Sequence, residues 1–370
     1  MEPIRVLQVV VSMDAGGIET MLMNYYRNID RSKVQFDFLL HCKHKSHYED
    51  EIEAMGGKIY RVPSYHPKDL FKHKKALKAF FIEHPEYKVV HSHIKFYGLY
   101  VLNAAKKAGV PMRIAHSHIS TNFYKLNKTL PFRMYTRARF SNKYTHVYAC
   151  SPEAAEYMAP GKEYTIMNNA VDVTSFVYNA SKRASIRREF GLGEETVLGH
   201  VGRFSDQKNH LFLIDIFAEF VKLRPDSRLM LVGGGTLLDD VKEKVNALGL
   251  DNKVIFTGVR KDIFDLMCAM DMFVFPSKYE GFPVTLVEAQ SSDLPCIISD
   301  TFSKTAIISD RVQVLSLNDS PTLWAEKIAD VDLSLARRDS SELMKEAGMD
   351  IRSNAKKIQK VYLEAYGYGE

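Results

Sequence analysis

The chain has 370 residues, of which 46% are hydrophobic and 26% are charged, ordinary values for a globular protein. No apolar run reaches the length of about 18 residues that a membrane-spanning helix needs, and the four cysteines lack zinc-ligand spacing, which excludes both features. The net charge of +5 conceals an asymmetry, because residues 1–170 carry 25 Lys or Arg against 15 Asp or Glu, whereas the other residues carry 25 against 30.

The first half of the chain alternates between short apolar segments and amphipathic segments. This alternation is typical of a parallel β-sheet that is covered by helices on both faces. We expect strands at 5–11, 35–40, 58–62, 88–92, 113–115 and 146–150, and helices that include 19–28 and 72–83.

A second block of the same kind follows. Its expected strands are 197–201, 228–232, 254–257, 272–275 and 296–298, and its helices include 211–223 and 237–248. Residues 168–182 lack regular periodicity and indicate a crossing between two domains, 1–170 and 183–349. Residues 350–366 have helical spacing of apolar groups, and this last helix could pack on either domain, including back on the first.

Two glycines follow the first expected strand, where its helix begins. Gly16 and Gly17 would let a ligand approach the backbone, and the start of a helix offers free N–H groups and the positive end of a dipole. A diphosphate fits such a place. The stretch is not GxGxxG, so the dinucleotide fingerprint is absent, and a plain tight turn is the alternative interpretation.

Two cations occupy the corresponding turn of the second block. Arg203 and Lys208 are five residues apart, between the strand at 197–201 and the helix that follows it. If they converge there, they suit the pyrophosphate of a departing nucleotide. Ordinary exposed side chains without a ligand are the alternative.

Two glutamates follow the strand at 272–275. Glu280 lies in a loop, and Glu288 lies inside a helix that we expect to begin near Val284. Carboxylates placed in this way can face one cleft and accept hydrogen bonds from the hydroxyls of a sugar and of a ribose. The alternative is pairing of Glu280 with the helix dipole and solvent exposure of Glu288.

These residues stand in three longer motifs. They are Gly-Gly-x-Glu at 16–19, Val-Gly-Arg-x-x-x-x-Lys-Asn at 201–209 and Pro-Ser-x-x-Glu-Gly-Phe-Pro-x-x-Leu-x-Glu-Ala at 276–289. With them the chain resembles the family 4 retaining glycosyltransferases of the GT-B fold, over about residues 4–366, and in particular the branch that builds bacterial capsular and exopolysaccharides. The resemblance implies an α/β protein in which two Rossmann-like domains present parallel sheets across a cleft.

The resemblance also implies a site for a nucleotide-sugar donor. Arg203 and Lys208 would hold the diphosphate, Glu288 would bind the ribose, and Glu280 would bind hydroxyls of the sugar. The other implied donor-binding residues are Gly16 and Gly17 near the diphosphate, Val259 and Arg260 near the base, and Gly281, Phe282, Pro283 and Val284 near the sugar.

Four histidines lie at the ends of two expected strands in the first half. His116, just after the strand at 113–115, matches the family histidine beside the anomeric region, and with Glu280, Arg203 and Lys208 it completes the implied catalytic set. His91, His93 and His118 are assigned weakly to the acceptor side. A buried, hydrogen-bonded histidine is the alternative for each.

The implied chemistry is transfer of a hexosyl or N-acetylhexosaminyl group with retention of configuration, without a metal or another cofactor. A phosphate oxygen of the leaving group would take the acceptor proton during front-face attack. UDP is the preferred nucleotide by analogy. Three departures from the family pattern bear on the identity of the donor sugar: Pro283 removes a backbone N–H, Asp293 stands where the family usually has glycine, and Thr305 lies near the place where a further glutamate is often found.

Residues 87–152 contain no Asp or Glu but eleven Lys or Arg. Such a segment indicates an anionic partner, which could be a diphosphate, a membrane surface or nucleic acid, or else a solvated basic face. No nucleic-acid module is present, so we expect no nucleic-acid binding. Apolar side chains that could lie on a bilayer are interspersed in it, namely Phe123, Tyr124, Leu126, Leu130, Phe132 and Met134.

We therefore expect a cytoplasmic protein, without a signal peptide, that contacts the inner face of the membrane peripherally. Its acceptor would be a glycan or a polyprenyl-diphosphate-linked glycan. Two alternatives remain open. One is a non-catalytic sugar-nucleotide-binding partner of another transferase, and the other is a UDP-sugar 2-epimerase of the same architecture, which the acid-free segment disfavours because it would need catalytic carboxylates there.

Overall fold

The computed structural model describes residues 2–14, 16–118, 130–280 and 282–368. The chain forms two compact units. Unit 1 comprises Met1–Ala170 together with Asp350–Glu370, and unit 2 comprises Val171–Met349. The chain therefore passes from one unit to the other twice.

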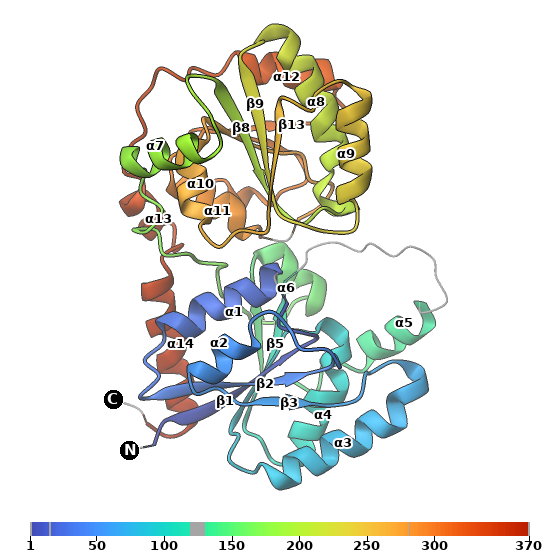
Figure 1. Ribbon diagram of the computed structural model, residues 1–370. Helices are drawn as coiled ribbons and strands as arrows, with labels where there is room; N and C mark the ends of the chain where they lie inside the picture. Colours follow the sequence, from blue (N-terminus) through green and yellow to red (C-terminus); the bar gives the residue numbers. More distant parts are fainter. Residues whose placement is uncertain (1, 15, 119–129, 281, 369–370) are drawn as a thin grey trace. The chain divides into compact units, whose positions relative to one another are not determined.

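Unit 1 contains a parallel sheet of seven strands in the order β3-β2-β1-β4-β5-β6-β7 (Figure 1). The strands are β1 (Ile4–Val10), β2 (Val34–Leu40), β3 (Ile59–Arg61), β4 (Val89–Ser92), β5 (Met112–Ser117), β6 (His146–Ala149) and β7 (Thr165–Ile166). The helices are α1 (Gly17–Asn28), α2 (Glu49–Ala54), α3 (Leu70–Glu83), α4 (Gly98–Lys107), α5 (Leu130–Ala138), α6 (Pro152–Met158) and α14 (Ile351–Ala365), with short 3-10 helices η1 (Pro67–Asp69) and η2 (Lys95–Tyr97).

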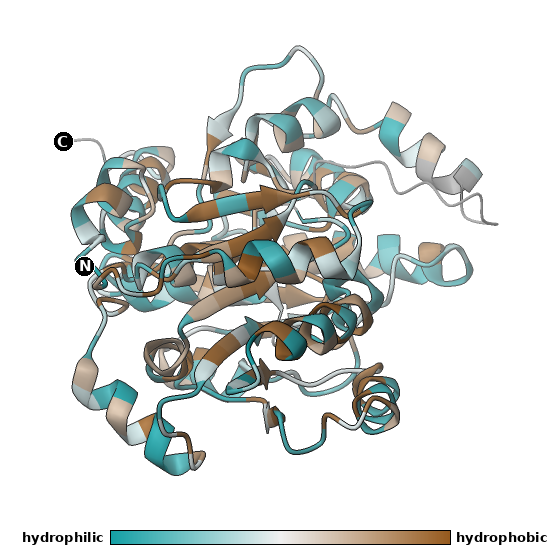
Figure 2. Cartoon of the chain, turned by 90° about the horizontal axis from the view of Figure 1, so that it is seen from above, coloured by the Kyte–Doolittle hydropathy of each residue, from teal (hydrophilic) through white to brown (hydrophobic). Residues whose placement is uncertain are grey.

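Both faces of this sheet are buried, as alternation along β1 illustrates. Val6 and Val10 belong to the core under α1, α2 and α14, whereas Leu7 and Val9 belong to the core under α3 and α4. Apolar residues accordingly gather on the strands, and hydrophilic residues gather on the outer faces of the helices (Figure 2).

Unit 2 contains a parallel sheet of six strands in the order β10-β9-β8-β11-β12-β13. The strands are β8 (Thr196–Val201), β9 (Ser227–Val232), β10 (Val254–Gly258), β11 (Met272–Phe275), β12 (Cys296–Ser299) and β13 (Val312–Leu315). The helices are α7 (Ala180–Glu189), α8 (His210–Leu223), α9 (Leu238–Ala247), α10 (Ile263–Ala269), α11 (Val284–Ser291), α12 (Pro321–Ala329) and α13 (Ser341–Glu346), with η3 (Asp206–Lys208) and η4 (Lys304–Ala306). Trp324 of α12 is fully buried with α8 and α9 against one face of the sheet.

The strand order reverses at one place in each sheet. In unit 1 the chain builds β1, β2 and β3 outward and then returns to place β4 beside β1, and in unit 2 it returns in the same way to place β11 beside β8. In open α/β sheets, ligands bind outside the carboxyl ends of the strands at such a reversal. The predicted motifs lie at these ends: Gly16 and Gly17 after β1, Arg203 and Lys208 after β8, and Glu280 after β11.

One expected strand was too short, and two strands were missed. The strand predicted at 113–115 extends to Ser117, so His116 lies within β5 and not after it. The strands β7 and β13 were not predicted, since β7 has only two residues and both are exposed, and Val314 of β13 is also exposed.

None of the described helices has both the length and the apolar character that crossing a membrane requires.

Candidate active site

Lys208 and Glu280 meet in unit 2. Lys208 ends η3 in the loop after β8, and Glu280 lies in the loop after β11, the neighbouring strand. The Lys208 Nζ and Glu280 Oε1 atoms are 2.7 Å apart, and the two side chains are only 16% and 7% exposed. Lys208 Nζ also lies 4.4 Å from the centroid of the Phe275 ring. The structure therefore brings together two residues that the sequence assigned to one site.

Backbone contacts hold these two loops in place. The Lys278 N–H donates to the Gln207 carbonyl (2.8 Å), and the Gln207 side-chain amide donates to the Tyr279 carbonyl (3.0 Å). The Asn209 side chain donates to the Pro276 carbonyl (3.1 Å). Asn209 adopts a left-handed conformation with φ +57°, which Asn tolerates better than most residues, and it begins α8. The site is thus rigidly tied to the ends of β8 and β11.

The glycine-rich loop after β9, which was not predicted from the sequence, packs against the loop that carries Arg203 and Lys208. Gly233 and Gly235, after β9, have φ values of +141° and +151°. A Cβ atom on Gly233 would lie 2.1 Å from the Gly202 carbonyl oxygen, and one on Gly235 would lie 2.5 Å from that of Phe204. Only glycine fits these close approaches. The run Gly233-Gly234-Gly235 directly after a strand was the signal that could have revealed the loop.

Glu288 is part of the second turn of α11, and it is neither fully exposed nor ion-paired within the described chain. Although it keeps some accessible surface, its carboxyl group is surrounded by protein, and this desolvation raises its pKa to about 7. Solvent exposure, the alternative interpretation of this residue, is therefore wrong.

In the first turn of the same helix, the hydroxyl of Thr285 is buried and has no hydrogen-bond partner among the residues that the structure describes.

The remaining predicted donor residues of unit 2 have different surroundings. Val259 is 68% exposed, whereas Arg260 is ion-paired with Glu189 (2.7 Å) and Asp262 (2.6 Å). Arg203 is exposed. Phe282, Pro283 and Val284 are buried at the start of α11, and Gly281 is outside the described residues. Arg260 is therefore held by carboxylates, while Val259 presents its side chain to solvent.

In unit 1, Gly16 and Gly17 begin α1. Gly16 is the N-cap residue, with extended backbone geometry, and Gly17 is the first helical residue. A Cβ atom added to Gly17 would meet nothing within 4 Å. The packing of the described residues therefore does not require glycine at this position.

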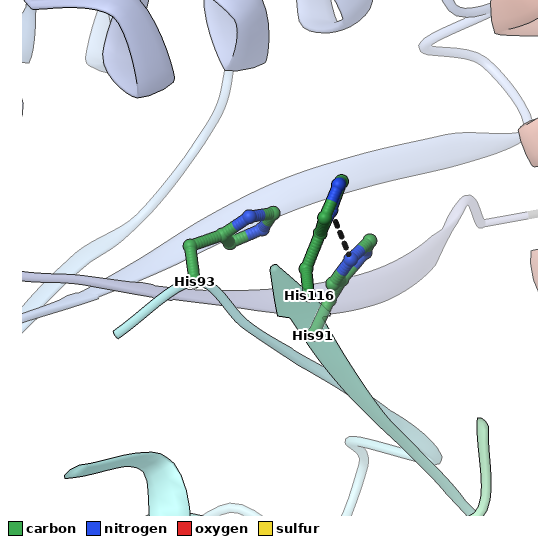
Figure 3. A group of neighbouring side chains, drawn as sticks. All are labelled: His91, His93 and His116. Carbon is green, nitrogen blue, oxygen red and sulfur yellow. Dashed lines mark hydrogen bonds between the residues drawn. The ribbon is translucent and has the colours of Figure 1, made fainter. Parts of the chain in front are cut away.

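The four predicted histidines form one cluster on the sheet of unit 1. All are at most 7% exposed, and burial lowers the pKa of each below the usual value, most strongly for His91, His93 and His116. His91 Nε2 lies 3.0 Å from His116 Nδ1, a contact that Figure 3 marks with a dashed line. His93 Nδ1 lies 2.9 Å from His118 Nε2. The imidazoles are therefore neutral near pH 7 and hydrogen-bonded in two pairs.

Each pair has one buried nitrogen that remains unsatisfied. His91 Nδ1 contacts the Tyr362 hydroxyl of α14 (2.8 Å), and His93 Nε2 contacts Gln8 Oε1 of β1 (2.9 Å). His116 Nε2 and His118 Nδ1 have no hydrogen-bond partner within the described part of the chain. The alternative interpretation, buried and hydrogen-bonded histidines, describes the observed state.

The acid-free basic segment is only partly described. Phe123, Tyr124 and Leu126 lie outside the described residues, as do the side chains of Leu130 and Phe132, and Met134 is 62% exposed. Some cations of the segment are structural, since Arg113 donates to the carbonyls of Lys143 (2.9 Å) and Val110. Two other cations of the segment, Arg139 and Lys143, line a cavity of about 400 Å³ between α3, α4 and the end of α5. Lys74 lines the same cavity.

Comparison with known proteins gave two family models that together cover most of the chain. Residues 15–175 match the model described as Glycosyltransferase Family 4, and residues 182–348 match that of Glycosyl transferases group 1. A putative glycosyltransferase of Bacillus subtilis, EpsF, is 33% identical and covers 97% of this chain and 96% of its own.

Two further relatives have more specific names. The capsular polysaccharide biosynthesis glycosyltransferase CapH of Staphylococcus aureus is 25% identical over 97% of this chain and 99% of its own. The UDP-Gal:alpha-D-GlcNAc-diphosphoundecaprenol alpha-1,3-galactosyltransferase of Escherichia coli is 27% identical over 77% of each chain. Among solved structures, HepE of Anabaena in complex with UDP and glucose aligns over 98% of this chain and 96% of its own, with a TM-score of 0.72 and 19% identity. That likeness shows the fold, two Rossmann-like units of the GT-B type.

Proposed function

The chain belongs to glycosyltransferase family 4, and from this premise we propose that it transfers a sugar from a UDP-sugar to a polyprenyl-diphosphate-linked glycan, with retention of configuration. The observation that carries the proposal is the Lys208–Glu280 pair at the reversal point of the sheet in unit 2. An ammonium group suits the donor diphosphate, and a carboxylate suits sugar hydroxyls. In the structure, each of these two groups is the hydrogen-bond partner of the other.

Donor binding would exchange this ion pair for contacts with the substrate. Lys208 Nζ would turn from Glu280 toward the diphosphate, and the freed carboxylate would accept hydrogen bonds from the sugar. Arg203, exposed on the same loop, would add a second positive charge as the nucleoside diphosphate departs. Glu288 on α11 would accept hydrogen bonds from the ribose.

We propose that transfer proceeds without a metal ion. Two side-chain cations and the N-terminal N–H groups of helices can stabilise the charge that develops on the leaving phosphate. A phosphate oxygen of the leaving group would take the proton of the attacking acceptor hydroxyl on the same face of the sugar. We propose that His116 contacts the donor sugar and that His91, His93 and His118 serve the acceptor.

The proposed acceptor and its place rest on the relatives and on charge. The Escherichia coli relative acts on a diphosphoundecaprenol-linked sugar, as its name states. In this chain, Lys74, Arg139 and Lys143 line one cavity without a carboxylate among its lining residues. Such a cavity, together with the exposed Met134, supports peripheral contact with an anionic membrane surface at the cytoplasmic face.

The test is a donor screen with purified protein and a panel of UDP-, GDP- and ADP-sugars. Thermal stabilisation reports donor binding, and release of nucleoside diphosphate with a lipid-linked acceptor reports turnover. We expect stabilisation by UDP-sugars that is lost in Lys208→Ala and in Glu280→Ala. The matched control is Lys222→Ala, which removes an exposed ion pair with Glu219 on α8 and leaves the loops intact.

A double variant separates binding from folding. Each single substitution leaves a largely buried charge unpaired, which costs about 2–3 kcal/mol of stability for a pair that keeps some exposure. Lys208→Met with Glu280→Gln removes both charges, and we expect it to recover most of that stability without recovering donor binding. Absence of a response to any nucleotide in folded wild-type protein would overturn the donor site. Tight binding with no turnover would instead favour a non-catalytic partner of another transferase.

A further inference from the structure

The four histidines gather because strand periodicity places them on one face of the sheet. His91 and His93 are two residues apart at the end of β4, and His116 and His118 are two residues apart at the end of β5. The strands are adjacent and parallel, with His91 opposite Ile114, so the two pairs extend side by side toward the carboxyl edge. Figure 3 shows three of the rings converging above the sheet.

The inner nitrogens of the cluster have the spacing of metal ligands. His91, His93 and His116 each offer a nitrogen atom that lies within 4.8 Å of the others. The two direct contacts, His91 to His116 and His93 to His118, are 3.0 and 2.9 Å. Ligand nitrogens of a tetrahedral Zn²⁺ site, with Zn–N bonds of about 2.0–2.1 Å, stand about 3.3 Å apart. Small rotations of the rings would therefore make room for an ion between the nitrogen atoms that now form these two hydrogen bonds.

The outer nitrogens of two of these rings, His91 and His93, already have hydrogen-bond partners. His91 Nδ1 contacts the Tyr362 hydroxyl, and His93 Nε2 contacts Gln8 Oε1, both buried. Metal-ligating histidines characteristically use the second ring nitrogen in this way, which fixes the tautomer and directs a lone pair inward. When Gln8 accepts from His93 Nε2–H, His93 Nδ1 is a bare acceptor.

Two buried nitrogens also have no partner within the described residues, His116 Nε2 and His118 Nδ1. Each is the second nitrogen of a ring whose first nitrogen contacts another histidine, so a flip of the ring would offer it to an ion as the ligand. An unsatisfied buried polar atom in a native structure calls for a ligand, a water or an ion. The donor set consists of imidazoles only, with no carboxylate among the potential ligands. Such a set suits Zn²⁺, Cu²⁺ or Ni²⁺ and disfavours Mg²⁺ and Ca²⁺.

We propose that His91, His93, His116 and His118 bind one divalent transition-metal ion within unit 1, with Tyr362 and Gln8 as the groups that orient two of the ligands. The ion has no role in the transfer step. A second part of the proposal rests on the proposed function of His116. When the ion binds His116, this side chain is no longer available to the donor sugar, so the bound ion inhibits transfer.

The first experiment measures binding directly and needs no activity. Purified full-length protein is freed of metal with a chelator and titrated with Co²⁺, whose absorption in the visible range reports tetrahedral nitrogen coordination. We expect saturation at one ion per chain and displacement of Co²⁺ by Zn²⁺. Absence of the band, or binding without a defined stoichiometry, overturns the proposal.

Variants locate the site. His93→Gln and His118→Gln remove ligands and should abolish the Co²⁺ band, whereas His47→Gln, which changes an exposed histidine outside the cluster, should leave it unchanged. Tyr362→Phe keeps all four ligands and should weaken Zn²⁺ affinity by about 10- to 100-fold. This variant keeps the test informative if loss of a ligand unfolds unit 1. An unaltered affinity in all of these variants contradicts the site.

The inhibitory role has a separate readout. With nucleoside diphosphate release as the assay, Zn²⁺ should inhibit wild-type protein, and a chelator should restore the rate. Tyr362→Phe should need about 10- to 100-fold more Zn²⁺ for the same inhibition, in parallel with its weaker binding. Stoichiometric metal binding without any effect on transfer overturns the inhibitory role alone. Failure of the donor screen leaves the Co²⁺ measurement intact, so the two proposals fail independently.

Discussion

Glu288 combines a predicted role in ribose binding with an unfavourable environment. Protein atoms surround its carboxyl group on α11 and raise its pKa to about 7, from an ordinary value of about 4.5. Between these two pH values the folded protein keeps the proton and the unfolded chain releases it. The unfolded state then binds fewer protons, so stability falls as pH rises through this window and levels off above pH 7.

We expect Glu288→Gln to stabilise the protein at pH 8 and to change little near pH 4. The shift of the pKa corresponds to at most about 3 kcal/mol, and residual exposure of the side chain reduces it. Thermal unfolding midpoints measured from pH 4 to pH 8 check this, and binding of UDP should weaken in the same variant. Parallel pH profiles for wild type and Glu288→Gln would contradict a desolvated carboxyl group.

At the residue scale, motifs predicted which side chains meet but not what holds them. The sequence assigned Lys208 and Glu280 to one site because each follows a strand within a recognisable motif, and the structure joins them at 2.7 Å. It did not predict the support by Gly233 and Gly235, because that depends on carbonyl oxygens of a loop about thirty residues away along the chain. Spacing within one motif carries no information about such a partner.

At the scale of elements, the end of α11 explains a departure from the family pattern. Asp293 follows the helix with φ +50°, the left-handed conformation for which glycine is usual. The Leu294 N–H bonds to the Ala289 carbonyl and the Asp293 N–H bonds to the Gln290 carbonyl, which together form a Schellman motif. The fully buried Asp293 carboxylate also accepts hydrogen bonds from the Arg338 backbone N–H (2.7 Å) and the Ser340 hydroxyl (3.2 Å). Asp293 therefore has a structural role that glycine could not fill.

Substitutions at Asp293 should rank by how much of this role they keep. Asp293→Ala loses the carboxylate, removes its ion pair with the Arg311 guanidinium and strains the left-handed backbone, for a total of about 3–5 kcal/mol. Asp293→Gly loses the same contacts but does not strain the backbone. Asp293→Asn keeps some of the hydrogen bonds and tolerates the left-handed conformation better than Ala does. Urea unfolding of the three variants should give stability in the order Asn, Gly, Ala. Greater stability of Ala than of Gly would contradict the backbone argument, and we expect the donor preference to stay unchanged.

The predictability of the elements depended on burial. The strand expected at 272–275 matches β11 because all four residues are apolar and fully buried. β13 lies at the edge of its sheet, and of its four residues only Leu315 is buried, so its short sequence resembled a loop. β5 was predicted too short because the polar residue His116 continues it. Its burial is compensated by the contact with His91 of β4, which in turn contacts Tyr362 of α14.

At the scale of the whole molecule, α14 returns to unit 1 after the chain has built unit 2. Asp350 caps the helix by accepting from the Ser353 N–H (2.9 Å), and Ile358 and Tyr362 are buried against α1 and β2. The Tyr362 ring meets Phe36 edge to face, with centroids 5.9 Å apart. The sequence predicted a helix here from apolar spacing but left open which domain it joins, because spacing identifies a buried face and not its partner.

We expect Ile358→Ala to destabilise unit 1 selectively. Removal of this buried side chain should cost about 2–4 kcal/mol. Hydrogen exchange should accelerate in peptides from residues 1–170 and stay unchanged in peptides from 171–349. Lys357→Ala, on the exposed face of the same helix, is the matched control. Equal acceleration in both groups of peptides would show that the two units unfold together.

The return of α14 also sets an order of events on the ribosome. Domains generally fold as units while the chain is being made, the earlier one first. Here the segment that completes the earlier unit is synthesised after all of Val171–Met349. Unit 2 therefore has every residue that it needs while nascent unit 1 still exposes the apolar surface of β2 and α1. Chaperones that bind nascent chains should thus be engaged mainly by the N-terminal half, and for the whole time that the second half takes to emerge.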